Sequence, residues 1–174
     1  MKSFLKYFIV VVLLAFGIWL GMSNWNSRKV KKEIGNQIQT LQHCSFESLC
    51  GKEICIDEYN PAKPTVIIYF HPECEHCQYE ASEIGKSSDQ FEKANMILVT
   101  SDDSTLRIEA FAMKYHLWEV DNLTILIDRK RHFINYFGTT VVPSIFIYGP
   151  DRKLLKIWKG EVQMKAVIST ISFF

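Results

Sequence analysis

The sequence has little excess charge of either sign. Its 20 lysines and arginines nearly balance 19 aspartates and glutamates, for a formal net charge of +1 at pH 7. Proteins that bind nucleic acid neutralise phosphates with clustered lysine and arginine, so this balance argues against a nucleic-acid partner. An internal repeat or low-complexity tract is also lacking, which excludes a repeat array. The 48% of hydrophobic residues is enough for one domain with a real core and an appendage.

The N-terminus lacks the marks of a removed signal peptide. No charge occurs from Tyr7 to Ser27, and Tyr7 to Met22 is almost wholly apolar. Lys2 and Lys6 precede this run, as in a signal sequence, but no Ala-x-Ala site and no lipoprotein cysteine follow. The run approaches the roughly 20 residues of a membrane span. We therefore expect an uncleaved signal-anchor over residues 1–27 with one transmembrane helix. A buried core helix, the alternative, would show a polar stripe.

The charges around this run disagree about its orientation. More basic residues follow it than precede it: Arg28, Lys29, Lys31 and Lys32. A literal positive-inside count would leave the rest of the chain in the cytosol. The signal-like N-terminus and the five cysteines favour an oxidising compartment instead. We expect a single-pass protein of the cell membrane whose remaining chain faces the periplasm or the cell exterior.

The rest of the chain divides into a stalk and one domain. Apolar residues at helical spacing predict an amphipathic stalk over residues 28–43. In the domain, residues 44–174, strand-like and helix-like segments alternate. The expected strands are 46–49, 54–59, 65–70, 96–100, 123–127, 144–148 and 154–158. The expected helices are 75–86, a segment capped by Ser101 or Asp103 and ending near 115, 132–137 and 163–171. This order predicts an α/β fold with a central mixed sheet flanked by helices.

Two cysteines lie where a predicted strand meets a predicted helix. The segment HPECEHCQYE follows the buried run TVIIYF and carries Cys74 and Cys77. A structural disulfide in so small a loop would remove little entropy from the unfolded chain. A zinc site would need a second close pair of ligands, which is absent, although His71 and His76 could supply nitrogen. The redox interpretation has a mechanism. The helix dipole and free N–H groups favour a Cys74 thiolate that attacks a disulfide, and Cys77, one turn on, resolves the product.

These features give the chain a resemblance to a known family. The pair, the turn at Gly51 and the late stretch FGTTVVPSIF (residues 137–146) resemble those of thioredoxin-fold proteins. The match is specifically to the membrane-anchored TlpA-like thiol–disulfide oxidoreductases of the redoxin-domain family, over roughly residues 44–171. The resemblance implies a thioredoxin fold and a cis peptide bond before Pro143, facing the cysteine pair. It also implies that the Val142 backbone pairs with an extended substrate segment.

The sequence departs from the family's pattern at several positions. Glu73 replaces an aromatic residue before the first cysteine, and His76 replaces the proline often found inside the motif. Ile68 stands where thioredoxin has a buried acid. Glu80 matches a glutamate of some TlpA-like reductases and could carry protons for the pair, with a solvated helix glutamate as the alternative. His76 could donate to the Cys74 thiolate or, if protonated, stabilise it.

The sequence therefore predicts a membrane-tethered thiol–disulfide oxidoreductase, most simply a reductase, with Cys74 and Cys77 as catalytic residues. It requires no cofactor and no metal, because the pair itself carries two electrons. Its partners would be a protein disulfide substrate and a redox partner that supplies electrons. The alternatives are a copper-handling chaperone of the same fold, binding through Cys74, Cys77 and a histidine, and a non-catalytic binding module. Peroxidase activity is not expected, because the Pro-x-x-x-Thr-x-x-Cys pattern of peroxiredoxins is absent.

The remaining cysteines bracket the first predicted hairpin. An oxidising compartment would favour one disulfide among them, without fixing the pair. These residues are Cys44, Cys50 and Cys55. Three histidines have no partner pattern and are interpreted as ordinary loop or helix residues: His43, His116 and His132.

Overall fold

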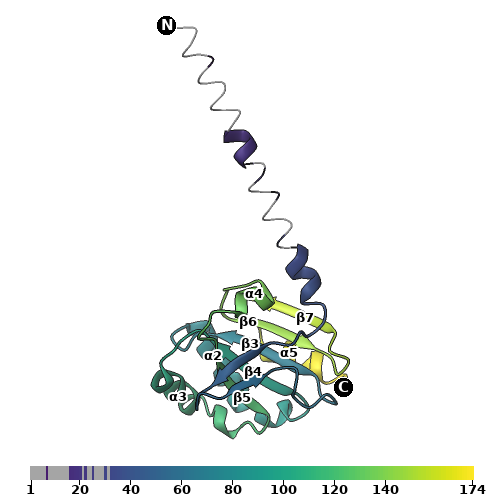
Figure 1. Cartoon of the computed structure of the whole chain (residues 1–174). Helices are drawn as coiled ribbons and strands as arrows, with labels where there is room; N and C mark the ends of the chain where they lie inside the picture. The colour runs from purple at the N-terminus through teal and green to yellow at the C-terminus, as the bar shows by residue number, and fades with distance from the viewer. Residues whose placement is uncertain (1–6, 8–15, 21, 23–24, 26–29, 31) are drawn as a thin grey trace. The chain divides into compact units, whose positions relative to one another are not determined.

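The computed structural model describes residues 7, 16–20, 22, 25, 30 and 32–174 (Figure 1). The chain divides into two compact units, Met1–Asn36 and Gln37–Phe174. Most of the expected signal-anchor lies outside the described residues, as do Lys2, Lys6 and the basic residues 28, 29 and 31. Within the part of the chain that the structure does describe, no helix has both the length and the apolar character of a membrane span.

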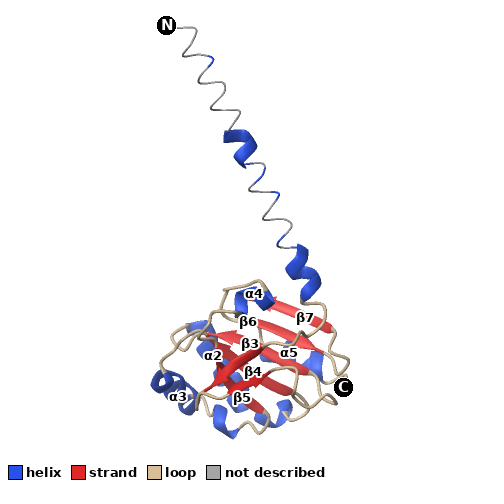
Figure 2. Ribbon diagram, in the orientation of Figure 1, coloured by secondary structure: helices blue, strands red, loops and turns tan. Residues whose placement is uncertain are grey.

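The second unit contains a seven-stranded sheet and the helices that cover it (Figure 2). The strands are β1 Ser45–Ser48, β2 Glu53–Cys55, β3 Thr65–Phe70, β4 Asn95–Thr100, β5 Leu123–Ile127, β6 Ser144–Tyr148 and β7 Leu154–Lys159. The helices are α2 Glu75–Lys86, α3 Thr105–Lys114, α4 Phe133–Phe137 and α5 Met164–Ile171, with short 3-10 turns at Ser88–Phe91 and Leu117–Glu119.

The strand order is β2-β1-β5-β4-β3-β6-β7. The central strands β3, β4 and β5 are parallel, and the outer strands join antiparallel on both sides. The mixed α/β sheet expected from the sequence is confirmed. Because β3 and β4 are parallel neighbours, the loops that follow them emerge at the same edge of the sheet. The cysteine pair lies at this edge.

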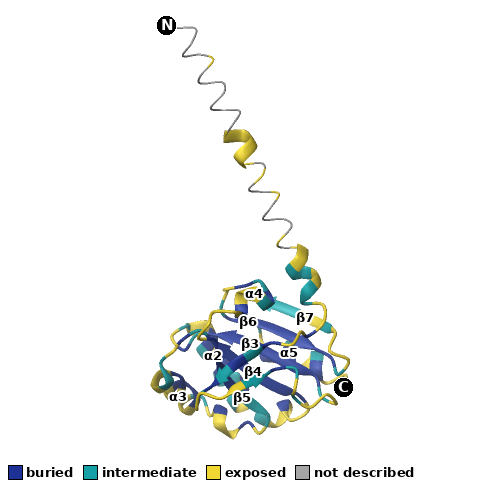
Figure 3. Cartoon of the chain, viewed as in Figure 1, coloured by how far each residue is buried: buried dark blue, intermediate teal, exposed yellow. Residues whose placement is uncertain are grey.

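Helices on both faces bury the centre of the sheet (Figure 3). All six residues of β3 are buried, as in a strand covered on both sides. Val66, Ile68 and Phe70 belong to the core beneath α2, α3 and α5. The alternate residues, Ile67 and Tyr69, belong to the core beneath α4. This two-residue period fixes which side of the sheet each strand residue faces.

The compact second unit begins ahead of Cys44. The Tyr148 hydroxyl donates to the Ile38 carbonyl at 3.1 Å, and Thr40 forms an isolated bridge with Lys153. Leu41 is buried in the core beneath α4. The last residues of the predicted stalk therefore pack on the domain.

Two elements differ from the sequence expectation. The second strand of the first hairpin, β2, ends at Cys55, because Ile56 leaves the sheet and turns into the core. Helix α3 starts after Ser104, whose side chain caps it, and not after Ser101 or Asp103. On α2, the aromatic side chain of Tyr79 is 45% exposed. The inner face is formed by other residues at helical spacing: Cys77, Glu80, Ala81 and Ile84.

Candidate active site

Cys74 is the N-cap residue of α2. Its N–H donates to the His71 carbonyl at 3.1 Å, and its own carbonyl accepts from the Gln78 N–H at 2.9 Å. The Cys74 thiol is partly exposed, and it is free, as is that of Cys77. The sequence predicted this position at the helix start. The unpaired N–H groups and the dipole of the helix act on a group placed there, and they favour an anion.

Cys77 lies one turn further along α2 and is only 2% exposed. Burial is the main reason why the pKa of its thiol is raised well above the ordinary value, and the neighbouring Cys74 and Glu80 add to the effect. A hydrogen bond from the His71 backbone acts in the opposite direction. The pair therefore combines an accessible outer thiol with an inner thiol that retains its proton at neutral pH.

The Val142–Pro143 peptide bond faces the cysteine pair. This bond is cis, as the resemblance implied. The Cys74 thiol lies 3.9 Å from the Val142 carbonyl oxygen. The Pro143 carbonyl accepts from the Gly160 N–H at 2.8 Å, which ties this segment to the end of β7. Within the described chain no protein group accepts from the Val142 N–H. A backbone donor is thus left free in the residue that contacts Cys74.

Glu80 is a buried acid on the same face of α2 as Cys77. Its side chain is 2% exposed, so the alternative of a solvated helix glutamate is wrong. Oε1 accepts from the Val162 N–H at 2.9 Å, whereas Oε2 is buried with no partner among the described protein groups. Burial raises the pKa of Glu80 to about 7, against the lowering effect of the Val162 hydrogen bond. A carboxyl group with such a pKa can both accept and release a proton near neutrality.

His76 has a different partner from the Cys74 thiolate that the sequence suggested. Its ring is exposed, and Nδ1 pairs with the carboxylate of Glu161, in the loop between β7 and α5. The structure thus gives His76 a carboxylate partner in place of the Cys74 sulfur. Through its charge, this histidine lowers the pKa of Glu80, whereas Glu161 raises it.

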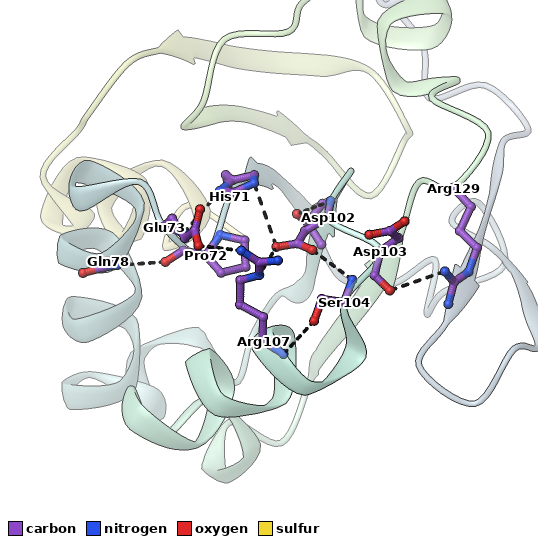
Figure 4. Close-up of polar contacts among 10 residues, drawn as sticks. His71, Pro72, Glu73, Gln78, Asp102, Asp103, Ser104, Arg107 and Arg129 are labelled. Atoms are coloured by element: carbon purple, nitrogen blue, oxygen red, sulfur yellow. Dashed lines mark hydrogen bonds and ion pairs between the residues drawn. The ribbon is translucent and has the colours of Figure 1, made fainter.

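A second polar cluster borders the start of α2 (Figure 4). Asp102, in the loop after β4, has a side chain that is 4% exposed, and the Arg107 Nε lies 2.9 Å from its Oδ2. The same guanidinium also pairs with the Glu73 carboxylate, immediately before Cys74. The His71 Nε2 lies 3.9 Å from the same Asp102 oxygen. Arg107 therefore offsets two negative charges close to the cysteine pair.

Sequence reasoning missed Asp102 and Arg107. A signal was present, because the carboxyl ends of neighbouring parallel strands meet at one edge of a sheet. Asp102 follows the predicted strand 96–100, just as the cysteine pair follows 65–70. The register of α3, which brings Arg107 against both acids, could not be inferred while its capping residue was open.

The other cysteines form no disulfide. Cys44, Cys50 and Cys55 are all free thiols, so the disulfide expected among them is not present. Cys44 is buried, and this raises the pKa of its thiol to about 12. His43 has close partners after all, because its ring lies between Cys55 and Asp57.

Comparisons with known proteins agree with this architecture. A model of the AhpC/TSA family matches residues 34–157. The thiol–disulfide oxidoreductase ResA of Bacillus cereus (strain ATCC 10987 / NRS 248) is 22% identical over 166 residues, covering 92% of this chain and 91% of that protein.

Two solved structures from Mycobacterium tuberculosis have the same fold. One, a secreted disulfide oxidoreductase homologous to E. coli DsbE, has a TM-score of 0.65 at 15% identity and covers 80% of this chain and 98% of that one. The other, DsbF in its mixed oxidized and reduced forms, has a TM-score of 0.64 at 22% identity and covers 79% and 96%. The likeness shows that the fold is thioredoxin-like.

Proposed function

The chain belongs to the AhpC/TSA family, and on that basis we propose that it is a thiol–disulfide oxidoreductase working through Cys74 and Cys77. The observation that carries the proposal is the arrangement around Cys74. This thiol lies at the start of α2 and contacts the Val142 carbonyl. The same helix carries a buried thiol, Cys77, and a buried acid, Glu80, on its inner face. The relationship to ResA supports the same class of reaction.

The reaction proceeds in two exchanges. In the first, the Cys74 thiolate attacks one sulfur of a substrate disulfide, a mixed disulfide forms, and the first substrate sulfur leaves as a thiolate and takes up a proton. In the second, Cys77 loses its proton and its sulfur attacks the Cys74 sulfur. The mixed disulfide breaks, the second substrate thiolate leaves and is protonated, and the Cys74–Cys77 disulfide remains. The substrate gains two electrons and the pair loses two. A redox partner returns the electrons by the reverse exchange.

Glu80 supplies the base for the second exchange. Cys77 retains its proton at neutral pH, because burial raises its pKa, so the second exchange needs an acceptor nearby. Glu80 is buried on the same face of the helix, and its pKa of about 7 suits proton transfer near neutrality. Two nearby charged residues act on the pKa of Glu80 in opposite directions: Glu161 raises it and His76 lowers it.

The Val142–Pro143 segment serves as the docking edge for the substrate. An extended chain that pairs with the free Val142 N–H would bring its disulfide next to Cys74. Main-chain pairing tolerates many sequences, and a protein disulfide is therefore the substrate class that we propose.

We further propose that residues 1–27 are a signal-anchor and 28–43 a stalk whose last residues pack on the catalytic domain, residues 44–174, on the periplasmic or outer side of a membrane. The uncharged run from Tyr7 to Ser27 supports this organisation. The copper-handling alternative requires a histidine as a third ligand beside Cys74 and Cys77. Within the described residues, no histidine lies close enough to Cys74 and Cys77 to complete a group of metal-binding atoms.

The proposal is tested with the reduced protein and a model protein disulfide such as that of insulin, in metal-free buffer. Reduction of the disulfide with matching loss of the two thiols supports it, as does oxidation of a dithiol by the oxidised protein, and a lack of exchange in both directions would contradict it. The direction of the reaction in the cell follows from the reduction potential of the pair. A value near that of thioredoxin, about −270 mV, indicates a reductase, and a value near that of DsbA, about −120 mV, indicates an oxidant.

A further inference from the structure

Three potential metal ligands of different chemistry meet at the start of the first hairpin. The Nε2 atom of His43 lies 3.9 Å from the Cys55 sulfur, and its Nδ1 lies 3.1 Å from the Asp57 carboxylate. One ligand atom from each residue can be chosen so that all three lie within 4.8 Å of one another. Cys55 ends β2, while His43 precedes β1. The antiparallel pairing of these two strands therefore holds the group together.

The carboxylate of Asp57 is not fully used by the protein. His43 Nδ1 lies 3.1 Å from each of its oxygens, but only Oδ2 meets the geometry of a hydrogen bond. Oδ1 is buried and has no hydrogen-bond partner in the described chain. Arg152 donates to the backbone carbonyl of Asp57 at 2.7 Å, but its guanidinium is no closer than 4.0 Å to the carboxylate. An oxygen with a buried, unshared lone pair thus remains available in the group.

The donor set indicates which ion fits. Imidazole, thiolate and carboxylate together are ligands of zinc and of similar divalent transition metals, whereas calcium and magnesium take oxygen. In a tetrahedral zinc site, bonds of about 2.0 Å to nitrogen and 2.3 Å to sulfur place these two atoms about 3.5 Å apart. The observed 3.9 Å is close to that value. The His43 side chain is 71% exposed, so its ring can turn to adjust the remaining distances.

We propose that His43, Cys55 and Asp57 bind one divalent transition-metal ion, zinc by preference, at a site separate from the Cys74–Cys77 pair. Three protein ligands leave the fourth tetrahedral position for water. Binding replaces the Cys55 thiol proton with the metal, so a bound ion protects this thiol from alkylation and oxidation.

The experiment uses the full chain carrying Cys74→Ser and Cys77→Ser, so that the redox pair cannot bind the probe. Zinc alone is titrated in competition with a chromophoric chelator. We expect one ion per chain. His43→Gln and Cys55→Ser should each weaken binding by more than about 100-fold, since losing even a partner of a ligand costs about 10- to 100-fold. Cys50→Ser is the matched control, because Cys50 is an exposed free thiol of the same hairpin. It should bind zinc like the parent.

A second readout identifies the ligand residue directly. The unaltered chain is alkylated with and without zinc, and each cysteine is followed by peptide mass spectrometry. Zinc should slow the alkylation of Cys55 but not that of Cys50. The proposal is overturned if the chain carrying Cys74→Ser and Cys77→Ser binds no zinc, or if adding Cys55→Ser to that chain leaves its zinc affinity unchanged. It is also overturned if zinc leaves the alkylation rate of Cys55 unchanged.

Discussion

The sulfur of Cys74 lies 3.9 Å from the carbonyl oxygen of Val142, a residue 68 positions further along the chain. Cys74 begins α2, whereas Val142 precedes the buried strand β6. Because β6 pairs with β3, the sheet itself brings the two residues together. The thiol is therefore held between the start of a helix and the backbone segment that we propose as the docking edge for a substrate.

Replacing Glu80 by Gln should slow the resolving step. Gln can still accept from the Val162 N–H but cannot take the proton of Cys77. We expect the rate of closure of the mixed disulfide to fall by about 100-fold, at the lower end of general base catalysis. Rapid-quench measurement of the mixed disulfide across a pH series tests this. The inflection near pH 7 should disappear in the variant, and an unchanged profile would show that another group accepts the proton.

The same carboxyl group should make stability depend on pH. Its folded-state pKa of about 7 exceeds its ordinary value of 4.5, so the folded chain binds the proton more tightly than the unfolded chain. The free energy of unfolding should therefore fall as pH rises from about 4.5 to about 7, by about 3 kcal/mol. Urea unfolding of the unaltered chain and of Glu80→Gln at pH 5 and pH 8 isolates the effect. The variant should gain stability relative to the unaltered chain at pH 8. If the difference in unfolding free energy between the two chains is the same at pH 5 and pH 8, Glu80 titrates like an ordinary, solvated carboxyl group.

Arg107→Gln should both destabilise the domain and reduce the reactivity of Cys74. Asp102 is buried and would lose its guanidinium partner, so the free energy of unfolding should fall. Glu73, next to Cys74, would lose its counter-charge. Arg107→Lys keeps the charge and should restore part of both properties. Iodoacetamide labelling of Cys74 and urea unfolding measure them. If Cys74 is labelled as fast in Arg107→Gln as in Arg107→Lys, the positive charge at position 107 has no effect on the reactivity of Cys74.

Much of the fold follows from the sequence because its central strands are long apolar runs. The segment TVIIYF was predicted as a buried strand and SIFIY as a strand, and they are β3 and β6. The inner face of α2 was harder, because Tyr79 is exposed while the polar residue Glu80 is buried. Hydrophobicity alone ranks these two residues in the wrong order. A buried acid is recognised only once Val162, 82 positions away, is seen to donate to it.

The polar contacts of the candidate site were the least predictable part. The position of Cys74 at a helix start follows from local sequence, and the cis bond before Pro143 followed from the resemblance. The partner of His76 lies 85 residues away, in a loop that carries no motif. Such long-range pairs depend on where loops cross the edge of the sheet, which local patterns do not encode.

The proposed orientation in the membrane is tested by reporter fusions after Phe174. Alkaline phosphatase, which needs an oxidising compartment, should be active there, and a reporter that works only in the cytosol should be silent. The opposite result would mean that the basic residues from Arg28 to Lys32 decide the orientation. Placing the reporters in a chain with these residues changed to Gln is the control.

The central claim is that Cys74 attacks and Cys77 resolves, and trapping tests it most directly. Cys77→Ser and Cys74→Ser variants are expressed in cells and compared on non-reducing gels, with mass spectrometry of any adducts. The account predicts that Cys77→Ser accumulates mixed disulfides through Cys74, whereas Cys74→Ser traps nothing and loses turnover, because its remaining thiol is buried and protonated. Adducts on Cys74→Ser but not on Cys77→Ser would reverse the two roles. The absence of adducts on both variants, with activity retained, would show that the pair is not the catalytic centre.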